Sequence, residues 1–414
     1  MSPTGPFLWT WVPSLVTVVC SGACAFTATW WLSTTPDGAQ ALAAAVAVGG
    51  LAALVVTAVA ARFIDRSRKR VAILGLAVAL TVLMAALAGP LSGSGRVAVA
   101  LVGATYVVVV VVEMLYLAAV ETASAAAAPA TWPLARVAVL TQVHSQLDRI
   151  VAPVFAGALI AAGHATTVPL VAAAMMTAGL LALAVVGRRH LPEAVAPVAP
   201  DGPPTRAIRV VRNDPGLRYL LAFGALSNLV VFPFVTMLPV LFGRIVPVGP
   251  ESAVWTARAV AAYGVGMLAG SVALAARRAD LAGPTGLRAA SAAFSLICGV
   301  VVAMAWQQRP EALVVGTGLT GLLFSVLVAA GGAHWLARTP PGVRAQVFGL
   351  KRLVAFSTIP LGTAVYGLLD PYVDHRWIPT LLAVTAGLLN LLLWRMSRPA
   401  RTTSIASPLA SAIT

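Results

Sequence analysis

The chain has 414 residues, of which 59% are hydrophobic and 10% are charged, and its mean hydropathy is +0.91. A typical soluble protein carries about 25% charged residues, so this composition excludes a water-soluble globule and indicates an integral membrane protein. The runs 41–48 and 107–112 are apolar on every face, which excludes the alternating strands of a transmembrane β-barrel. The formal net charge of +15 is gathered in short clusters between apolar segments. It therefore indicates membrane topology and not nucleic-acid binding.

A helix that crosses a bilayer needs about 20 mostly apolar residues. Twelve stretches meet this requirement, namely 11–35, 40–61, 71–91, 97–127, 135–163, 166–187, 217–245, 253–276, 287–306, 312–337, 344–369 and 377–396. The longest polar segment, 188–215, contains six prolines and is predicted to be a linker. The sequence therefore predicts an all-α membrane protein with twelve transmembrane helices in two six-helix halves, 1–187 and 216–396, followed by a tail over 397–414.

Lysine and arginine are distributed unequally between the two sides of this predicted bundle. Twenty of the 28 lie in loops on the side of the linker and the termini, and five lie on the other side. The remaining three are Arg149, Lys351 and Arg352, inside predicted helices. Cytoplasmic loops carry the basic excess, so we expect the linker and both termini in the cytoplasm. The richness in Gly, Ala and Val is typical of a high-GC bacterium, which predicts a bacterial plasma membrane location.

Two six-helix halves joined by a cytoplasmic linker are the plan of secondary transporters, whose substrate site lies at the midplane between the halves. The sequence has no Walker phosphate loop, no His-Glu-x-x-His motif and no Gly-x-Ser-x-Gly elbow, so neither ATP-driven transport nor a common hydrolase activity is predicted. An intramembrane lipid-modifying enzyme is an alternative class. It would need a catalytic constellation, and His144 with Asp148, four residues apart, is the only pair that approaches one.

Ionisable residues inside predicted spans are candidates for function, because each costs about 2.5–3.5 kcal/mol at a helix centre. The stretch 97–127 carries Glu113, and 135–163 carries Asp148 and Arg149. Counted from the intervening turn at about 1.5 Å per residue, Glu113 and Arg149 both lie about 21 Å deep. We expect Arg149 to pair with one of the two acids. The unpaired acid, which we expect to be Glu113, would then bind the coupling proton.

Other polar residues within the spans are candidates for contact with cargo. Gln142, Ser145 and Gln146 precede Arg149 at helical spacing and form a polar stripe that should face a cavity. In the second half, Asn228 and His334 would either contact cargo or hydrogen-bond between helices.

Two cations in the second half are close to a predicted helix end. Lys351 and Arg352 lie about 12 Å into 344–369, counted along the helix. At that depth we expect Lys351 to extend to the cytoplasmic interface. For Arg352 the sequence leaves open whether it does the same.

The loop after 40–61 reads Asp65-Arg66-Ser67-Arg68-Lys69-Arg70. It resembles the signature of the major facilitator superfamily between its second and third helices. The resemblance implies the twelve-helix fold in two halves and a transport function. Asp65 is expected to accept hydrogen bonds from a neighbouring helix end while Arg66 and Arg70 pair with acidic groups, so that together they gate one face of the transporter.

Three further stretches, 227–239, 263–270 and 341–362, resemble drug and siderophore exporters of that superfamily, including macrolide-efflux and enterobactin-export proteins. Together they imply a proton-coupled exporter of a drug, secondary metabolite or siderophore. The stretch 146–153 also resembles ferroportin-type iron exporters, so export of a divalent metal is the alternative. The expected partners are a small-molecule substrate, protons and the lipid bilayer. We expect a monomer with no cofactor and no resident metal.

Overall fold

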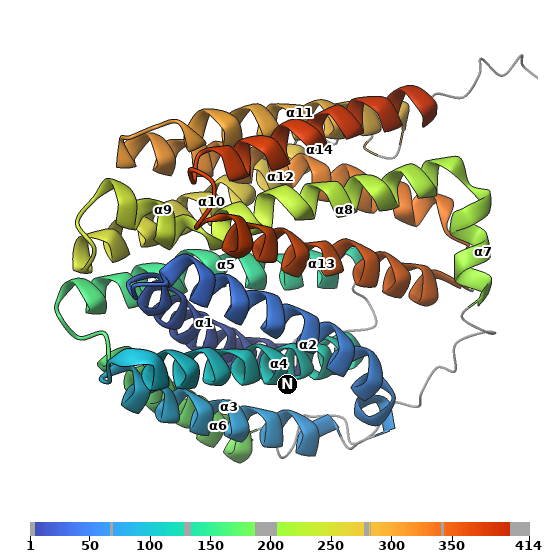
Figure 1. The fold of residues 1–414 in the computed structure, drawn as a ribbon. Coiled ribbons are helices and arrows are strands. Elements are labelled where there is room, and N and C mark those ends of the chain that lie inside the picture. Colours follow the sequence, from blue (N-terminus) through green and yellow to red (C-terminus); the bar gives the residue numbers. More distant parts are fainter. Residues whose placement is uncertain are drawn as a thin grey trace, which may run out of the picture.

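The computed structural model describes residues 5–66, 69–127, 134–186, 205–276, 281, 283–340 and 343–397, and the regular structure in this part of the chain is helical. The helices, labelled in Figure 1, are α1 (Gly5–Ser33), α2 (Gly38–Arg66), α3 (Lys69–Leu91), α4 (Gly95–Ala127), α5 (Leu134–Ala161), α6 (Thr167–Val186), α7 (Thr205–Asn213), α8 (Pro215–Thr236), α9 (Leu238–Ile245), α10 (Pro250–Ala276), α11 (Pro284–Ala305), α12 (Pro310–Arg338), α13 (Arg344–Leu369) and α14 (Trp377–Ser397).

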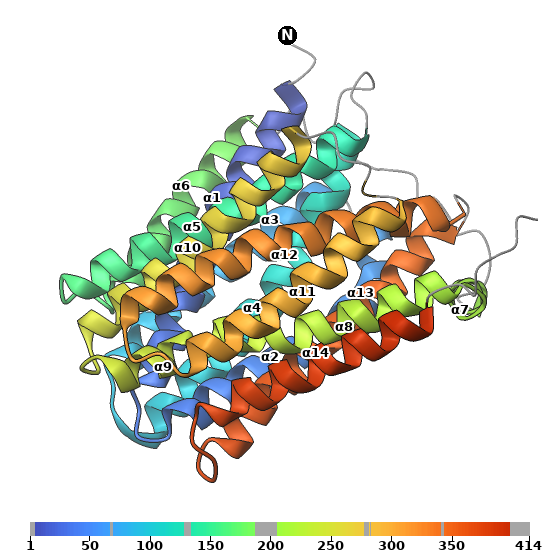
Figure 2. The same cartoon turned by 90° about the horizontal axis from the view of Figure 1, so that it is seen from above.

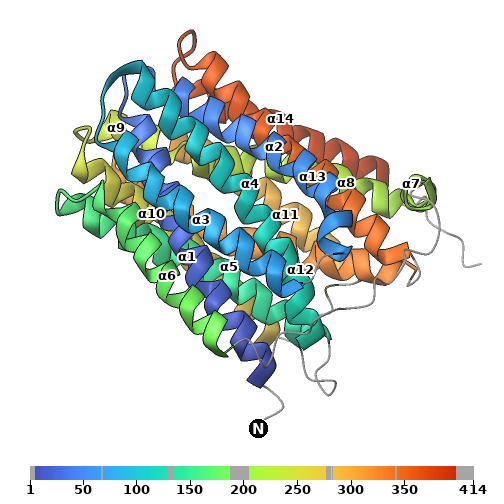
Figure 3. The same cartoon turned by 90° about the horizontal axis from the view of Figure 1, so that it is seen from below.

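The helices form two bundles, one made by α1–α6 and the other by α8–α14, which lie side by side in Figure 1; Figure 2 looks onto the second bundle. In the first half α1 packs against α4, α5 and α6, and α3 packs against α4 and α6. In the second half α12 packs against α10 and α11, and α8 packs against α13 and α14. The halves meet mainly along two helix pairs, α5 with α10 and α2 with α13 (Figure 3).

Within the described residues, ten helices are long and apolar enough to cross a membrane, namely α1–α4, α8 and α10–α14. This confirms a multi-pass membrane protein. The apolar stretch described in α6 is shorter, Thr167–Leu181, and α5 is not among the ten, so the full count of twelve spans stays a prediction. Apolar side chains such as Leu181, Val315 and Leu368 are exposed on the outside of the bundle, as lipid-facing residues should be.

Prolines mark the starts of four helices in the second half: Pro215, Pro250, Pro284 and Pro310. Proline suits the first helical turn because its missing N–H would have no partner within the helix there. The carboxylate of Asp214 caps α8 by accepting hydrogen bonds from the backbone N–H groups of residues 216 and 217, at 2.7 and 3.1 Å.

The structure differs from the sequence prediction in two places. The predicted helix 217–245 is divided at Met237 into α8 and α9. Pro239 stands in the first turn of α9, and a continuous helix would place its ring against the carbonyl four residues earlier. Residues 205–213 of the predicted linker form α7, whose Ala207 and Val211 are buried against the second half.

The two ends of the bundle are distinguished below by what they carry. The end with α7, the start of α8 and the end of α12 is called the linker end. The end with the α1–α2, α9–α10 and α13–α14 turns is called the turn end (Figure 1).

Candidate functional site

A cavity of about 350 Å³ lies between the two halves. The first half contributes Gln146 and Arg149 from α5, and the second half contributes residues of α8, α10, α12 and α13. The lining residues of the second half are Leu220, Phe223, Gly224, Ser227, Asn228, Phe232, Met267, Phe324, Leu327, Val328, Gly331, Gly332, Trp335, Lys351, Ala355 and Phe356. The cavity reaches the linker end, because Leu220, Trp335 and Lys351 each lie within the first or last two turns of their helices.

The turn end of the interface between the halves is closed by direct packing. The indole Nε1 of Trp30 on α1 donates a hydrogen bond of 3.2 Å to Ser252 Oγ on α10. A Cβ added to Gly157 on α5 would lie 2.6 Å from the Cβ of Ala257 on α10. Gly367 on α13 lies similarly close to Ala43 on α2. The cavity therefore lies on the linker-end side of this directly packed region of the interface.

Arg149 extends from the first half into an aromatic wall of the second half. Its guanidinium carbon lies 5.2 Å from the ring centroid of Phe232 and 5.4 Å from that of Tyr263. The close approach of α5 to α10 depends on Gly264, because a Cβ there would lie 2.7 Å from Ile150 Cγ1 and 3.3 Å from Arg149 Cβ. Gly264 belongs to the 263–270 stretch that the sequence singled out.

Lys351 supplies a second cation to the cavity. Its ammonium lies 5.7 Å from the ring centroid of Trp335 and 5.5 Å from that of Phe348. The Lys351 side chain is partly buried and lines the cavity beside these rings, and its expected extension to the cytoplasmic interface stays a prediction. The neighbouring Arg352 is exposed and does not line the cavity.

The polar candidates divide between the cavity and its surroundings. Gln146 and Asn228 line the cavity, and the Asn228 amide also donates a 2.9 Å hydrogen bond to the carbonyl of Ala355, which ties α8 to α13. His334 is buried outside the cavity lining, with Nδ1 3.0 Å from the Ala330 carbonyl of its own helix. Gln142 and Ser145 lie on α5, but their side chains fall outside the described residues.

The two acids lie behind the cavity, where α1, α4 and α5 meet. Glu113 lies within electrostatic range of Asp148 and near Ser21 of α1, whose hydroxyl donates a 3.1 Å hydrogen bond to the Val18 carbonyl. Asp148 Oδ1 lies against Gly22, and it is buried without a hydrogen-bond partner among the described residues. Neither acid lines the cavity.

The predicted ion pair between Arg149 and one of these acids does not form. Arg149 takes part in none of the ion pairs found in the described part of the chain, although Asp148 is its sequence neighbour. The reason is that the guanidinium extends toward α8 and α10, whereas Glu113 faces α1. Equal depth did not mean contact.

The predicted gate residues lie at the α2–α3 connection. Asp65 and Arg66 are in the last turn of α2, and Arg70 is in the first turn of α3. Their side chains are outside the described residues, so the gate stays a prediction.

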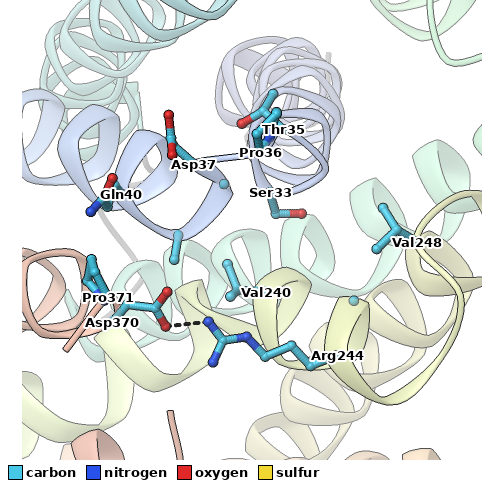
Figure 4. A pocket seen from close by; sticks show the side chains of 13 residues that line it. Ser33, Thr35, Pro36, Asp37, Gln40, Val240, Arg244, Val248, Asp370 and Pro371 are labelled. Atoms are coloured by element: carbon cyan, nitrogen blue, oxygen red, sulfur yellow. Dashed lines mark hydrogen bonds and ion pairs between the residues drawn. The ribbon is translucent and has the colours of Figure 1, made fainter. Parts of the chain in front are cut away.

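A second pocket, of about 310 Å³, lies at the turn end (Figure 4). Asp37 and Gln40 border it from the first half, and Arg244 and Asp370 border it from the second. Arg244 Nη2 and Asp370 Oδ1 form an ion pair at 2.5 Å. Because both residues belong to the second half, this pair braces α9 against the end of α13 and does not join the two halves.

The sequence offers several aromatic residues in predicted spans as cavity candidates, and two of them, Phe232 and Trp335, line the cavity. Sequence reasoning missed the other three aromatic residues of the wall, Phe223, Phe324 and Phe356, which come from three helices. An aromatic residue in a membrane helix gives the same sequence pattern whether it faces lipid, the packed core or a cavity, so the pattern along one helix could not select these three.

No protein-family model matches the chain, and no curated relative matches it in sequence. Solved structures do match its fold. A POT family transporter in complex with a thioalcohol-conjugated peptide has a TM-score of 0.70 at 11% identity, covering 95% of this chain and 96% of that one. A mutant of the nucleoside transporter NupG scores 0.68 at 13% identity, covering 95% and 100%. A bacterial metal transporter scores 0.67 at 14% identity, covering 96% and 99%.

These similarities extend over nearly the whole of each chain, and each of the three structures is that of a transporter. The chain therefore shares the all-helical fold of these transporters, while the count of twelve spans implied by the 65–70 loop stays a prediction. Matches at 11–14% identity establish only the fold. They do not test the resemblance of the other three stretches to drug and siderophore exporters.

Proposed function

We propose that this chain is a secondary active transporter that moves a small organic molecule by alternating access. The observation that carries the proposal is the cavity of about 350 Å³, which both halves line and which lies on the linker-end side of the direct contact between Trp30 and Ser252. A site between two rigid halves changes its exposure when the halves rock about it. The packing of α5 on α10 and of α2 on α13 supplies the contacts that would open and close.

The direction we propose is export. The excess of basic residues on the side of the linker places the linker end in the cytoplasm, so the cavity would load from inside the cell. The resemblance of 227–239, 263–270 and 341–362 to exporters supports the same direction.

We propose proton coupling through the acids Glu113 and Asp148. Two carboxylates within electrostatic range of each other repel, so protonation of one of them relieves the repulsion. Neither has an ion-paired cation among the described residues. The acids lie behind the cavity wall, and Asp148 is next to Arg149 in the chain. A change in the charge of Asp148 would therefore affect the cargo site through α5, which also carries Arg149. A change in the charge of Glu113 would act through the contact between α4 and α5. Glu113 remains our preferred carrier.

An organic cargo is favoured over a divalent metal. The cavity lining contains Arg149 and Lys351 and no Asp, Glu, His or Cys among the described residues. Divalent metals are held by such groups, not by cations. Across the described residues, no three His, Cys, Asp or Glu side chains gather into a metal-binding group.

The test is accumulation in proteoliposomes under an imposed pH gradient. Three probes share a naphthalene ring and differ in charge: naphthalene-2-sulfonate, naphthalene-2-sulfonamide and 2-naphthylmethylammonium. We expect at least one probe to move against its concentration gradient with wild-type protein, and a protonophore to abolish that movement. Glu113→Gln should uncouple it, and Arg352→Gln, an exposed residue outside the cavity, should not.

Two results would count against this proposal. If no probe moves uphill under any gradient, the transport function itself is wrong for this class of molecule. If uphill movement survives the protonophore, the proton is not the coupling ion. Full coupling in Glu113→Gln together with its loss in Asp148→Asn would keep proton drive and move the carrier to α5.

A further inference from the structure

We infer that the cargo is an amphipathic organic anion with a flat apolar body, held between Arg149 of the first half and Lys351 of the second. The inference rests on the proposed transport function and specifies its substrate class. It is argued from the charges, the walls and the position of the cavity.

The charge of the cavity is wholly positive among its described lining residues. Arg149 and Lys351 are the two ionisable side chains in the lining, and no acid accompanies them there. A charge inside the membrane is expensive unless it is paired. Arg149 interacts electrostatically with Asp148, but neither Asp148 nor Glu113 lines the cavity or forms an ion pair with Arg149 in the described part of the chain. A negatively charged cargo would supply a countercharge inside the cavity.

Aromatic rings hold both cations in place without neutralising them. The guanidinium of Arg149 lies over Phe232 and Tyr263, and the ammonium of Lys351 lies over Trp335 and Phe348. A ring face attracts a cation through its quadrupole but carries no net charge. The N–H donors of both cations therefore keep their capacity for strong hydrogen bonds to sulfonate, carboxylate or phosphate oxygens.

The uncharged lining residues determine which apolar group of the cargo fits the cavity. Aromatic side chains from α8, α12 and α13 border the cavity, together with the aliphatic Leu220, Leu327 and Val328. The aromatic members are Phe223, Phe232, Phe324, Trp335 and Phe356. Such walls favour planar apolar groups through offset or edge-to-face contacts. The volume of about 350 Å³ lies in the range of small-molecule sites.

The two cations belong to different halves of the molecule. Arg149 is on α5 and Lys351 is on α13, so an anion that contacts both would bridge the two halves. Its contacts with the two cations would become shorter as the halves approach each other at the linker end. The anion would therefore favour the closed or occluded state over the present one, which is the differential binding that a cargo must provide to drive a conformational change.

The test is equilibrium binding to purified protein in detergent, which needs no transport. The probes are again naphthalene-2-sulfonate, the neutral naphthalene-2-sulfonamide and the cationic 2-naphthylmethylammonium, and binding is measured by isothermal titration calorimetry. We expect the sulfonate to bind at least about tenfold more tightly than the sulfonamide, as a charge-assisted hydrogen bond implies. Arg149→Gln and Lys351→Gln should each remove most of this preference, whereas Arg352→Gln, the exposed neighbour of Lys351, should preserve it.

Charge-retaining variants separate recognition from misfolding. Arg149→Lys and Lys351→Arg keep a cation at each position and should keep the anion preference, whereas a folding defect would weaken all three probes equally. The inference is overturned if the neutral or cationic probe binds as tightly as the sulfonate, or if both glutamine variants retain the preference. Sulfonate binding without uphill transport would support this inference and count against the proposed transport function. Uphill transport of the cationic probe alone would support the transport function and overturn the inference that the cargo is an anion.

Discussion

Gly157→Ala tests whether the turn end of the interface opens during the transport cycle. The new methyl would lie 2.6 Å from Ala257 Cβ, whereas carbon atoms pack best at about 3.5–4.0 Å. Because α5 and α10 belong to different halves, moving the halves apart by about 1 Å here relieves the overlap without disturbing the packing within either half. Overpacking of this kind typically costs about 1–3 kcal/mol. If only the closed state bears this cost, the population open at the turn end rises about 5- to 150-fold.

A cysteine introduced at Ala253 reports this opening. Ala253 is fully buried at the same interface, and the native Cys20, Cys24 and Cys298 are also buried. In the Ala253→Cys background, Gly157→Ala should raise the rate of maleimide modification by the factor given above. The matched control is Gly179→Ala, whose added methyl meets only Val16 Cγ1 at 3.7 Å. Equal rates with and without Gly157→Ala, in protein of unchanged melting temperature, would refute a mobile turn end.

Three further predictions concern stability. Gly266→Ala should destabilise the second half by about 1–3 kcal/mol, because the added methyl would overlap the Gly318 carbonyl and lie 2.9 Å from the backbone nitrogen of Leu322 on α12. The control is Gly299→Ala, which has open space around the added methyl and should not lower the melting temperature. Asp214→Ala removes the cap of α8 and the 3.0 Å ion pair with Arg338, which should cost about 0.5–2 kcal/mol in thermal or denaturant unfolding. Burial lowers the pKa of His375, and Arg244 adds to that effect while Asp374 opposes it. At acidic pH the imidazole is therefore protonated more readily in the unfolded chain than in the folded one, so the free energy of unfolding should fall as pH drops below about 6.5. His375→Gln should flatten this dependence of stability on pH.

The sequence by itself determined the class of the protein and most of its helices. A bilayer leaves helices as the main way to satisfy the backbone of an apolar chain, so the length of each apolar run and the prolines beside it set the helix bounds. The predicted runs 71–91 and 377–396 differ from α3 and α14 by at most two residues at either end. The exceptions, the break at Met237 and the helix α7, fall where a proline sits inside an apolar run and where a short amphipathic segment is stabilised by packing on its neighbours.

The tertiary structure alone decided which side chains meet. Depth in the membrane can be counted along one helix, but two side chains at equal depth meet only if both point to the same place. The direction in which each side chain extends depends on how α4 and α5 are rotated and on what packs against them. Glu113 faces Ser21 of α1, and Arg149 faces the aromatic rings of the other half. Lys351 follows the same logic, because it lines the cavity beside the rings of Trp335 and Phe348.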